Sequence, residues 1–358
     1  MLKMRSAAPS LASLLSLLAL LALSTPARAA CDRGSWTGTI GAAPISLIFG
    51  DPEDDRRPAS ARYYYRRSLK ELYLRAGKAD PTTWEESDEV GRVTGSLQLD
   101  CQGDRLAGTW RSPDRRRALP VSARPAVDID GYHAEHLRDL KVDEETTHDF
   151  EGHVYDEQEV SDIPSVSTIA LWGDESGIAG INAQLWREAK EAMGEALDCV
   201  GEGRMRRGLQ HGYEYGWNHR PAAWNERYVV VMTSHEQYCG GAHPYWGNYD
   251  TVYDLGTGKE IDAAQWLMPA YRKEIDLTSL LGRLLIGRYL SVEDGETECL
   301  DKVAASGRLM HPARGGLVFR VAAGAYVYSP CMRDVTVPWE QAAPFLAPEG
   351  RLAAKAFR

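Results

Sequence analysis

The residues best suited to chemistry gather in one short segment, Tyr-Cys-Gly-Gly-Ala-His-Pro at positions 238–244. A histidine that hydrogen-bonds to a carboxylate can act as a general base. Asp250 and Asp254, which follow on the next expected strand, could supply that carboxylate to His243. The same histidine could equally be a hydrogen-bonded residue that fixes the turn, because Gly240 and Gly241 permit positive φ and a tight crossing between two strands. We expect the structural role for His243 over the catalytic one.

Cys239 raises a second chemical alternative. It lies four residues before His243, and a thiol beside a base can serve as a nucleophile. In an oxidising compartment the same thiol would instead form a disulfide. The choice therefore depends on where the chain is located.

The first 29 residues have the three parts of a cleavable secretory signal peptide. Lys3 and Arg5 form a positive region, residues 11–23 are almost entirely apolar, and Ala27-Arg28-Ala29 is a small-residue cleavage site. The apolar run is shorter than the ~20 residues that a membrane span needs, and no later segment approaches that length. We expect a periplasmic or secreted bacterial protein, cleaved near Ala29, without an integral membrane anchor.

All six cysteines follow the predicted signal peptide. An even number in an exported chain favours disulfides over a thiol nucleophile or a zinc site. Cys31 leaves lipoprotein processing open, although Arg28 stands where that pathway requires a Leu-like residue. Six cysteines allow 15 connectivities, so we predict the pairs from proximity within each part of the chain. They are Cys31–Cys101, Cys199–Cys239 and Cys299–Cys331.

A second group of histidines lies in the acidic stretch from residue 128 to 159. His133 and His136, with Glu135 and Asp143-Glu144-Glu145 nearby, could hold a metal ion, but their spacing matches no known ligand pattern. We therefore interpret residues 125–163 as a solvated acidic, histidine-rich linker. We predict no metal site and no cofactor.

Charge restricts the partners. The chain has 41 Lys and Arg against 51 Asp and Glu, a formal net charge of −10. Loss of the predicted signal peptide removes three basic residues, leaving 38 against 51, or −13. Such a protein is repelled by nucleic acid and by anionic membranes, so we expect no nucleic-acid partner and favour a basic one.

The elements that position these residues fall into two halves. Residues 31–124 show short alternating runs with turns between them, which predict a small antiparallel β-barrel or sandwich. Gly38, Gly95 and Gly108 lie inside strand patterns and indicate barrel bends or close backbone approach. The expected strands cover 35–41, 44–49, 61–65, 69–74, 82–86, 91–99 and 105–110.

Residues 164–350 mix helix and strand. Apolar residues recur at helical spacing over 177–201, and a second amphipathic helix is predicted at 276–289. Strands are expected at 213–215, 228–232, 250–255, 316–321 and 334–337, followed by a short helix from 338 to near 348. The pattern predicts an α+β domain, in which an antiparallel sheet has helices packed on one face.

The motif at 238–244, followed by Tyr-Asp-Leu-Gly-Thr-Gly-Lys-Glu-Ile at 253–261, resembles the C-terminal domain shared by the lysozyme-sensing anti-sigma factor RsiV and the peptidoglycan deacetylase PdaC. In that family a Tyr-x-Gly-Gly-Ala-His segment precedes a strand of the form Asp-Leu-x-Thr-Gly-Lys, and Val335–Trp339 is similar to its last strand and helix. The resemblance covers residues 164–349. It implies lysozyme binding or an accessory role beside a catalytic domain. We expect neither transmembrane signalling nor deacetylation, since the sequence shows no membrane-spanning helix and no deacetylase domain.

The first half is similar to a small β-rich module of bacterial secreted proteins.

Aromatic residues are concentrated around the Gly-Gly-Ala-His segment, from Tyr213 to Tyr249. Exposed tyrosine and tryptophan are typical of binding surfaces, whereas we expect more than half of these to pack in the core or in turns. The predicted binding residues are Tyr238, Gly240, Gly241, His243, Tyr245, Trp246 and Asp250.

Three functions remain open from the sequence. We expect an extracytoplasmic binding or accessory protein of the cell envelope, whose ligand is a cationic protein such as lysozyme, or a cell-wall glycan such as a peptidoglycan fragment. A cell-wall hydrolase that uses His243 with a carboxylate or Ser234 is the alternative, but no GxSxG, HExxH or paired-carboxylate motif supports an enzyme. The third is a structural module without a ligand.

Overall fold

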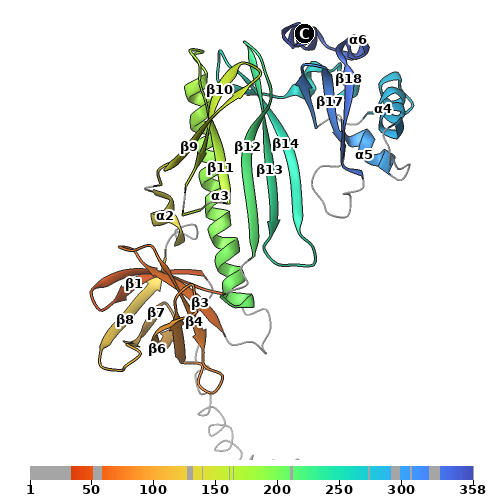
Figure 1. Cartoon of the computed structure of the whole chain (residues 1–358). Helices are drawn as coiled ribbons and strands as arrows, with labels where there is room; N and C mark the ends of the chain where they lie inside the picture. Colours follow the sequence, from red (N-terminus) through yellow and green to blue (C-terminus); the bar gives the residue numbers. More distant parts are fainter. Residues whose placement is uncertain are drawn as a thin grey trace, which may run out of the picture. The chain divides into compact units, whose positions relative to one another are not determined.

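The structure is a computed structural model that describes residues 34–50, 59–126, 132–138, 140–160, 162–163, 165–209, 213–272, 275–291, 299–306, 309–321 and 331–357. The predicted signal peptide and Cys31 lie outside the described residues. The chain forms two compact units, Met1–Tyr132 and His133–Arg358. The fold is α+β, as predicted (Figure 1).

The first unit is a closed barrel of eight antiparallel strands in sequential order, so the predicted barrel is confirmed. The strands are β1 (Gly34–Ile40), β2 (Ala43–Phe49), β3 (Ser60–Tyr65), β4 (Glu71–Ala76), β5 (Thr83–Ser87), β6 (Val93–Gln102), β7 (Arg105–Arg111) and β8 (Ala118–Pro125). Pairing of β1 with β8 closes the barrel. Cys101 at the end of β6 is disulfide-bonded, and its predicted partner Cys31 falls outside the described part of the chain.

Inward-facing side chains fill the barrel, as expected for eight strands. Phe49 packs edge-on against Trp36 and Trp84, with ring centroids 6.1 and 5.7 Å apart. A Cβ on Gly38 or on Gly108 would lie 2.1 Å from a backbone carbonyl oxygen of the neighbouring strand. Glycine at these positions therefore permits the close strand approach that the sequence indicated.

A carboxylate is buried in this barrel. Glu86 is 2% exposed, and it accepts hydrogen bonds from Tyr63 (2.6 Å), Trp110 (2.7 Å) and Thr94 (2.7 Å). A buried charge is tolerated when donors satisfy it, and these three donors occupy both carboxylate oxygens. Burial, followed by the charge of Glu86, raises the pKa of Tyr63 well above its ordinary value, so the tyrosine remains a donor.

The second unit contains a seven-stranded sheet in the order β15-β14-β13-β12-β11-β10-β9. Its strands are β9 (Glu144–Phe150), β10 (His153–Glu159), β11 (Val166–Leu171), β12 (Glu214–Trp224), β13 (Tyr228–Tyr238), β14 (Tyr245–Asp254) and β15 (Lys259–Ile261). One pair, β11 with β12, is parallel, unlike the antiparallel sheet we expected. The long helix between these strands returns the chain to the same end of the sheet, as parallel pairing requires.

The interpretation of residues 125–163 as a linker is wrong for the part that forms β9 and β10. These strands make an antiparallel hairpin at the edge of the sheet. Glu151 and Gly152 connect them with φ of 55° and 86°, the positive values of a two-residue type I′ turn. The first residues of β9 are polar on both faces and exposed, so the strand lacks the apolar alternation that would have revealed it.

Helix α3 (Ile178–Arg207) lies along one face of this sheet (Figure 1). Its buried residues Ile181, Leu185, Ala189 and Met193 recur at helical spacing and pack on β11 and β12. The helix predicted at 177–201 is confirmed and extends two turns further. The short helix α2 (Ala134–Arg138) also contacts α3.

A three-stranded antiparallel sheet and several short helices complete the second unit, and their core includes Val230 and Val252 of the large sheet. The elements are η2 (Ala263–Trp266), η3 (Pro269–Tyr271), α4 (Leu280–Ser291), α5 (Leu300–Ala305), β16 (Met310–Ala313), β17 (Gly316–Val321), β18 (Arg333–Pro338), α6 (Trp339–Ala342), η7 (Ala343–Phe345) and α7 (Pro348–Ala356). The predicted disulfide Cys299–Cys331 is present.

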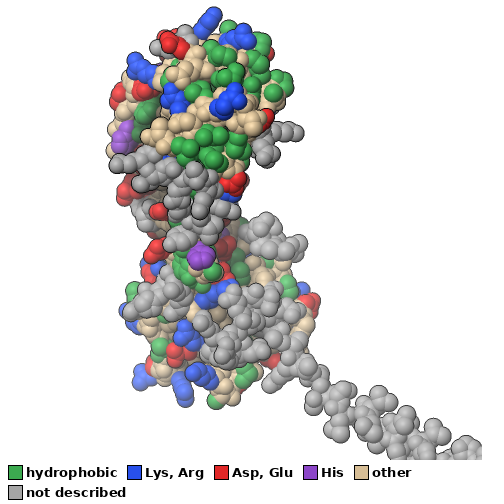
Figure 2. Space-filling view, turned by 90° about the vertical axis from the view of Figure 1, so that its right-hand side faces the viewer, with side chains coloured by type: hydrophobic (Ala, Val, Ile, Leu, Met, Phe, Trp, Pro, Cys, Tyr) green, Lys and Arg blue, Asp and Glu red, His purple; other side chains and the backbone are tan. Residues whose placement is uncertain are grey.

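The surface of the chain is mixed in charge. On the face drawn in Figure 2, Lys and Arg side chains are interspersed with Asp and Glu, and hydrophobic side chains lie among them. Among the described residues, none of the helices combines the length and the apolar character that a membrane span requires.

Candidate functional site

Aromatic side chains share one face of the large sheet near the connection between β13 and β14. Register places Tyr215 opposite Gln237 and Gln237 opposite Tyr245, and Trp217 opposite His235. Directly opposed residues point to the same side, so these side chains lie on one face. The His235 ring centroid is 5.1 Å from that of Tyr215 and 5.4 Å from that of Tyr245.

Helix α3 supplies carboxylates to the same face. Tyr215 donates a hydrogen bond to Glu195 Oε2 (2.9 Å), and Glu188, two turns earlier on α3, lies 3.3 Å from His219 Nε2. We call this set the aromatic–acidic face. Its members are Glu188, Glu195, Tyr215, Trp217, His235, Tyr245 and Tyr249.

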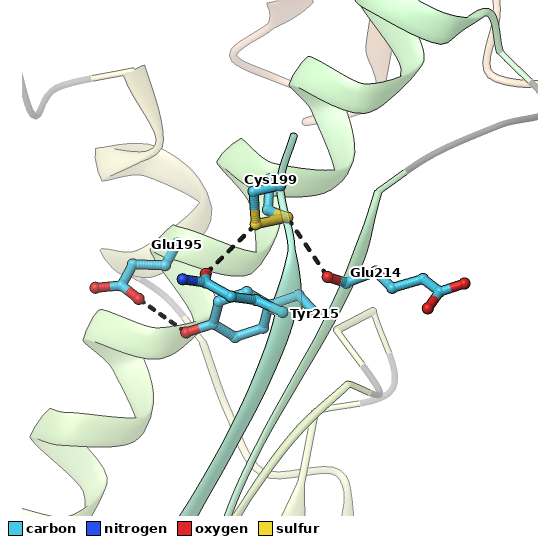
Figure 3. The surroundings of a disulfide bond; sticks show 6 residues. Glu195, Cys199, Glu214 and Tyr215 are labelled. Carbon is cyan, nitrogen blue, oxygen red and sulfur yellow. Dashed lines mark hydrogen bonds between the residues drawn. A yellow bond between two sulfur atoms is a disulfide. The ribbon is translucent and has the colours of Figure 1, made fainter. Parts of the chain in front are cut away.

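A disulfide fixes the helix to this end of the sheet. Cys199 on α3 is bonded to Cys239, which follows β13, as predicted from the sequence. Figure 3 shows Tyr215 directed at Glu195 beside this disulfide, whose sulfur atoms lie 3.7 Å from the Glu214 carbonyl oxygen and 3.4 Å from Gln237 Oε1. The cross-link thus holds the carboxylates of α3 against the tyrosines of the sheet.

Two tyrosines remain accessible on this face. Tyr245 is 40% exposed and Tyr249 is 46% exposed, although both belong to the regular strand β14. Gly247, which points to the same side between them, adds no side chain. Burial raises the pKa of the Tyr249 hydroxyl. The face therefore presents two accessible aromatic rings on the side of the sheet against which α3 packs.

Electrostatics keep the Tyr215 hydroxyl protonated and Glu188 charged. Burial first, and then Glu195, raise the pKa of Tyr215. Burial acts to raise the pKa of Glu188, but contacts with His219 and a hydrogen bond from Gln184 outweigh it and hold the pKa below its ordinary value. Glu188 is therefore an anion at neutral pH.

The structure also contains a chain of groups that resembles a catalytic arrangement. Thr168 Oγ1 lies 2.9 Å from His219 Nδ1, and His219 Nε2 faces Glu188. Hydroxyl, imidazole and carboxylate in this order are the parts of an activated nucleophile. Thr168 and the His219 side chain are both 0% exposed, however, so a substrate cannot reach the hydroxyl. We interpret the Thr168–His219–Glu188 series as a buried connection between β11, β12 and α3.

The structure brings only some of the predicted binding residues together, at the β13–β14 connection. Gly240 and Gly241 lie in the β13–β14 connection with φ of 99° and 98°, the positive values expected for them. The Tyr238 hydroxyl donates to the Gly241 carbonyl (3.2 Å), and His243 is exposed in the same connection. Tyr245 alone among the predicted residues belongs to the aromatic–acidic face. Trp246 is directed to the opposite face of the sheet.

Asp250 does not accompany His243. Its Oδ2 lies 3.0 Å from His311 Nδ1 and 2.6 Å from an Arg320 guanidinium nitrogen, and Arg320 is also paired with Asp334. Asp250 pairs with Met232 in the sheet, about 17 Å along β14 from Tyr245 at the usual strand rise. Asp250, one of the two carboxylates considered as possible partners of His243, therefore joins the large sheet to the three-stranded one instead.

The histidines considered as metal ligands have other contacts. His133 Nε2 lies 2.9 Å from Asp198 Oδ1, and the rings of His133 and His136 are 5.5 Å apart. Within the described ranges, groups of three or more His, Cys, Asp or Glu side chains arranged to hold a metal ion are not found.

Several residues of the face were missed by sequence reasoning. Glu188 and Glu195 are seven residues apart and so share one side of a helix, which was a usable signal. His235 of the face, and His219 beside Glu188, carried no such signal. Their proximity to α3 depends on strand register and on the 30-residue helix that separates β11 from β12 in the sequence.

Comparisons with known proteins give limited similarity. A scan against models of protein families and a search of curated proteins found no match. A solved DUF3298 family protein from Pseudomonas aeruginosa PAO1 has 13% identity and a TM-score of 0.33, covering 59% of this chain and 97% of that one. A member of the same family from Bacteroides fragilis NCTC 9343 has 13% identity and a TM-score of 0.34, covering 74% and 98%.

Proposed function

We propose that this chain is an extracytoplasmic binding protein of the cell envelope and that its partner is a cationic protein, bound through the aromatic–acidic face. The observation that carries the proposal is that Tyr245 and Tyr249, about half exposed, share the face to which α3 brings two carboxylates. Glu188 acts electrostatically on Tyr249, and Tyr245 contacts His235, which packs on the tyrosine bonded to Glu195. Lysine and arginine side chains bind both to carboxylates and to the faces of tyrosine rings.

Further observations support this function. Two disulfides are compatible with an oxidising compartment, and the predicted signal peptide would deliver the chain there. The acidic net charge accelerates association with a basic partner. The resemblance of residues 164–349 to the RsiV and PdaC domain points to lysozyme as a suitable cationic probe.

Calorimetric titration of lysozyme into the chain without its predicted signal peptide tests the proposal. We expect measurable binding that weakens as salt is raised, since exposed charge pairs are screened. Glu195→Gln removes one charge and keeps the side-chain shape, so we expect roughly tenfold weaker binding, about 1.4 kcal/mol. Tyr245→Ala and Tyr249→Ala should weaken binding to a similar extent.

Matched controls separate the face from general charge effects. Glu349→Gln removes an exposed carboxylate on α7, and Trp172→Ala removes an aromatic residue that is 58% exposed. Both should bind lysozyme as the unchanged chain does. Equal weakening by Glu349→Gln would mean that net charge alone drives association. Binding of muropeptides that is insensitive to salt, with no lysozyme binding, would replace the cationic partner with a cell-wall glycan.

A further inference from the structure

A second side of α3 carries a groove with α2. A contact between His133 Nε2 and Asp198 Oδ1 (2.9 Å) holds the residue before α2 to helix α3. Leu137 of α2 then lies over Gly194, where an added Cβ would be 3.2 Å from its Cδ1 atom. Beyond this contact the groove opens with a cavity volume of about 400 Å³. It is lined by Leu137, Ala183, Trp186, Arg187, Lys190 and Glu191.

The lining combines an apolar floor with positive charge. Leu137, Ala183 and the ring of Trp186 supply the apolar surface. Arg187 and Lys190 form neither a hydrogen bond nor an ion pair with any residue of the described chain. Glu191 stands one turn after Arg187, a spacing that often gives an ion pair in helices, yet the two are not paired here. The groove thus holds unpaired cations on a chain whose net charge is −10.

We infer that this groove binds a small organic anion with an apolar or aromatic body. An arginine fork matches the geometry of a carboxylate, sulfonate or phosphate group, and the indole of Trp186 offers a flat apolar surface to the rest of the ligand. The volume lies within the range of small-molecule pockets, about 300–1,000 Å³.

The groove is separate from the aromatic–acidic face. Five residues along an α-helix correspond to a rotation of about 140°, so Lys190 and Glu195 lie on different sides of α3. Arg187 acts through its charge on Glu188 of that face, so its removal should strengthen and not weaken the binding of a cationic protein. Loss of anion binding in the groove and loss of cationic-protein binding on the face can therefore be told apart.

A pair of fluorescent probes tests the anion requirement. 8-Anilinonaphthalene-1-sulfonate has an aromatic body and a sulfonate, and N-phenyl-1-naphthylamine has the same rings without the charge. We expect the full chain to bind the sulfonate probe more tightly than the neutral one. The double variant Arg187→Gln/Lys190→Gln should weaken binding of the sulfonate at least tenfold and leave that of the neutral probe within twofold.

A control variant locates the site. Lys355→Gln removes an exposed cation beside Leu352, an exposed apolar residue on α7 and outside the lining of the groove. It should leave both probes unaffected. The inference is overturned if the unchanged chain does not bind the sulfonate, if the double variant binds it as before, or if Lys355→Gln causes the same loss.

Discussion

Each of the two units contains a hydrogen bond from a tyrosine hydroxyl to a glutamate, but the surroundings of the two bonds differ. In the barrel Tyr63 donates to Glu86, and in the second unit Tyr215 donates to Glu195. Glu86 is buried and its two oxygens accept three hydrogen bonds, so it completes a core. Glu195 is exposed, and among the described residues Tyr215 is its one hydrogen-bond donor. A tyrosine–carboxylate pair therefore stabilises the barrel, whereas on α3 it orients a charge that remains available to a partner.

The largest expected effect comes from removing the cross-link that holds α3 to the sheet. Cys199→Ala/Cys239→Ala removes a disulfide that links residues 40 positions apart. The free energy of unfolding should fall by about 4 kcal/mol. Hydrogen exchange should increase in the C-terminal turns of α3 and at the ends of β13 and β14, while barrel peptides stay unchanged. Lysozyme binding should fall in the same variant. Unchanged exchange near residue 199 would show that packing alone positions the helix.

The comparison predicts unequal costs for removing the two carboxylates. Glu86→Ala leaves three donors without an acceptor, and each such loss costs about 1 kcal/mol or more, so we expect at least about 3 kcal/mol. Glu195→Ala should cost less than about 1 kcal/mol, because water replaces the lost acceptor. Hydrogen exchange of the barrel and of α3 measures both. Equal costs would remove the distinction between the two pairs.

Much of this architecture follows from local patterns. The barrel strands alternate, and α3 repeats its apolar residues at helical spacing, so both were predicted. Strand β9 escaped prediction because its early residues are polar on both faces. Asp250 was considered as a possible partner of His243 because the two are close in sequence, whereas its partner Arg320 lies 70 residues away and meets it only after the two sheets pack. Contacts of that kind depend on tertiary packing rather than on spacing.

Removing the tyrosine hydroxyls sharpens the comparison at a smaller scale. Tyr63→Phe and Tyr215→Phe each delete one hydrogen bond, at a cost of about 1 kcal/mol. Only Tyr215→Phe should also weaken binding of the cationic partner, by several fold, since Glu195 loses the donor that orients it. Calorimetry on both variants measures the difference. Similar affinities in the two would show that Glu195 needs no orientation.

The smallest effect concerns pH. Burial lowers the pKa of His219 below the ordinary 6.5, and Glu188 offsets this only in part. At a pH between the His219 pKa of the folded chain and that of the unfolded chain, only the unfolded chain binds a proton at this histidine. The contribution of His219 to stability is therefore fully present above pH 6.5 and is lost as the pH falls through the folded pKa.

No histidine occurs between residues 34 and 126, so the barrel should lack this dependence. Stability from hydrogen exchange, corrected for the intrinsic exchange rate at each pH, should decrease for α3 and β12 from pH 7.5 to 5.5 and stay level for the barrel. His219→Gln should flatten the profile of the second unit, leaving a weaker slope from His235, whose pKa burial also lowers. A parallel decline in both units would point to the acids instead, because the buried histidines belong only to the second.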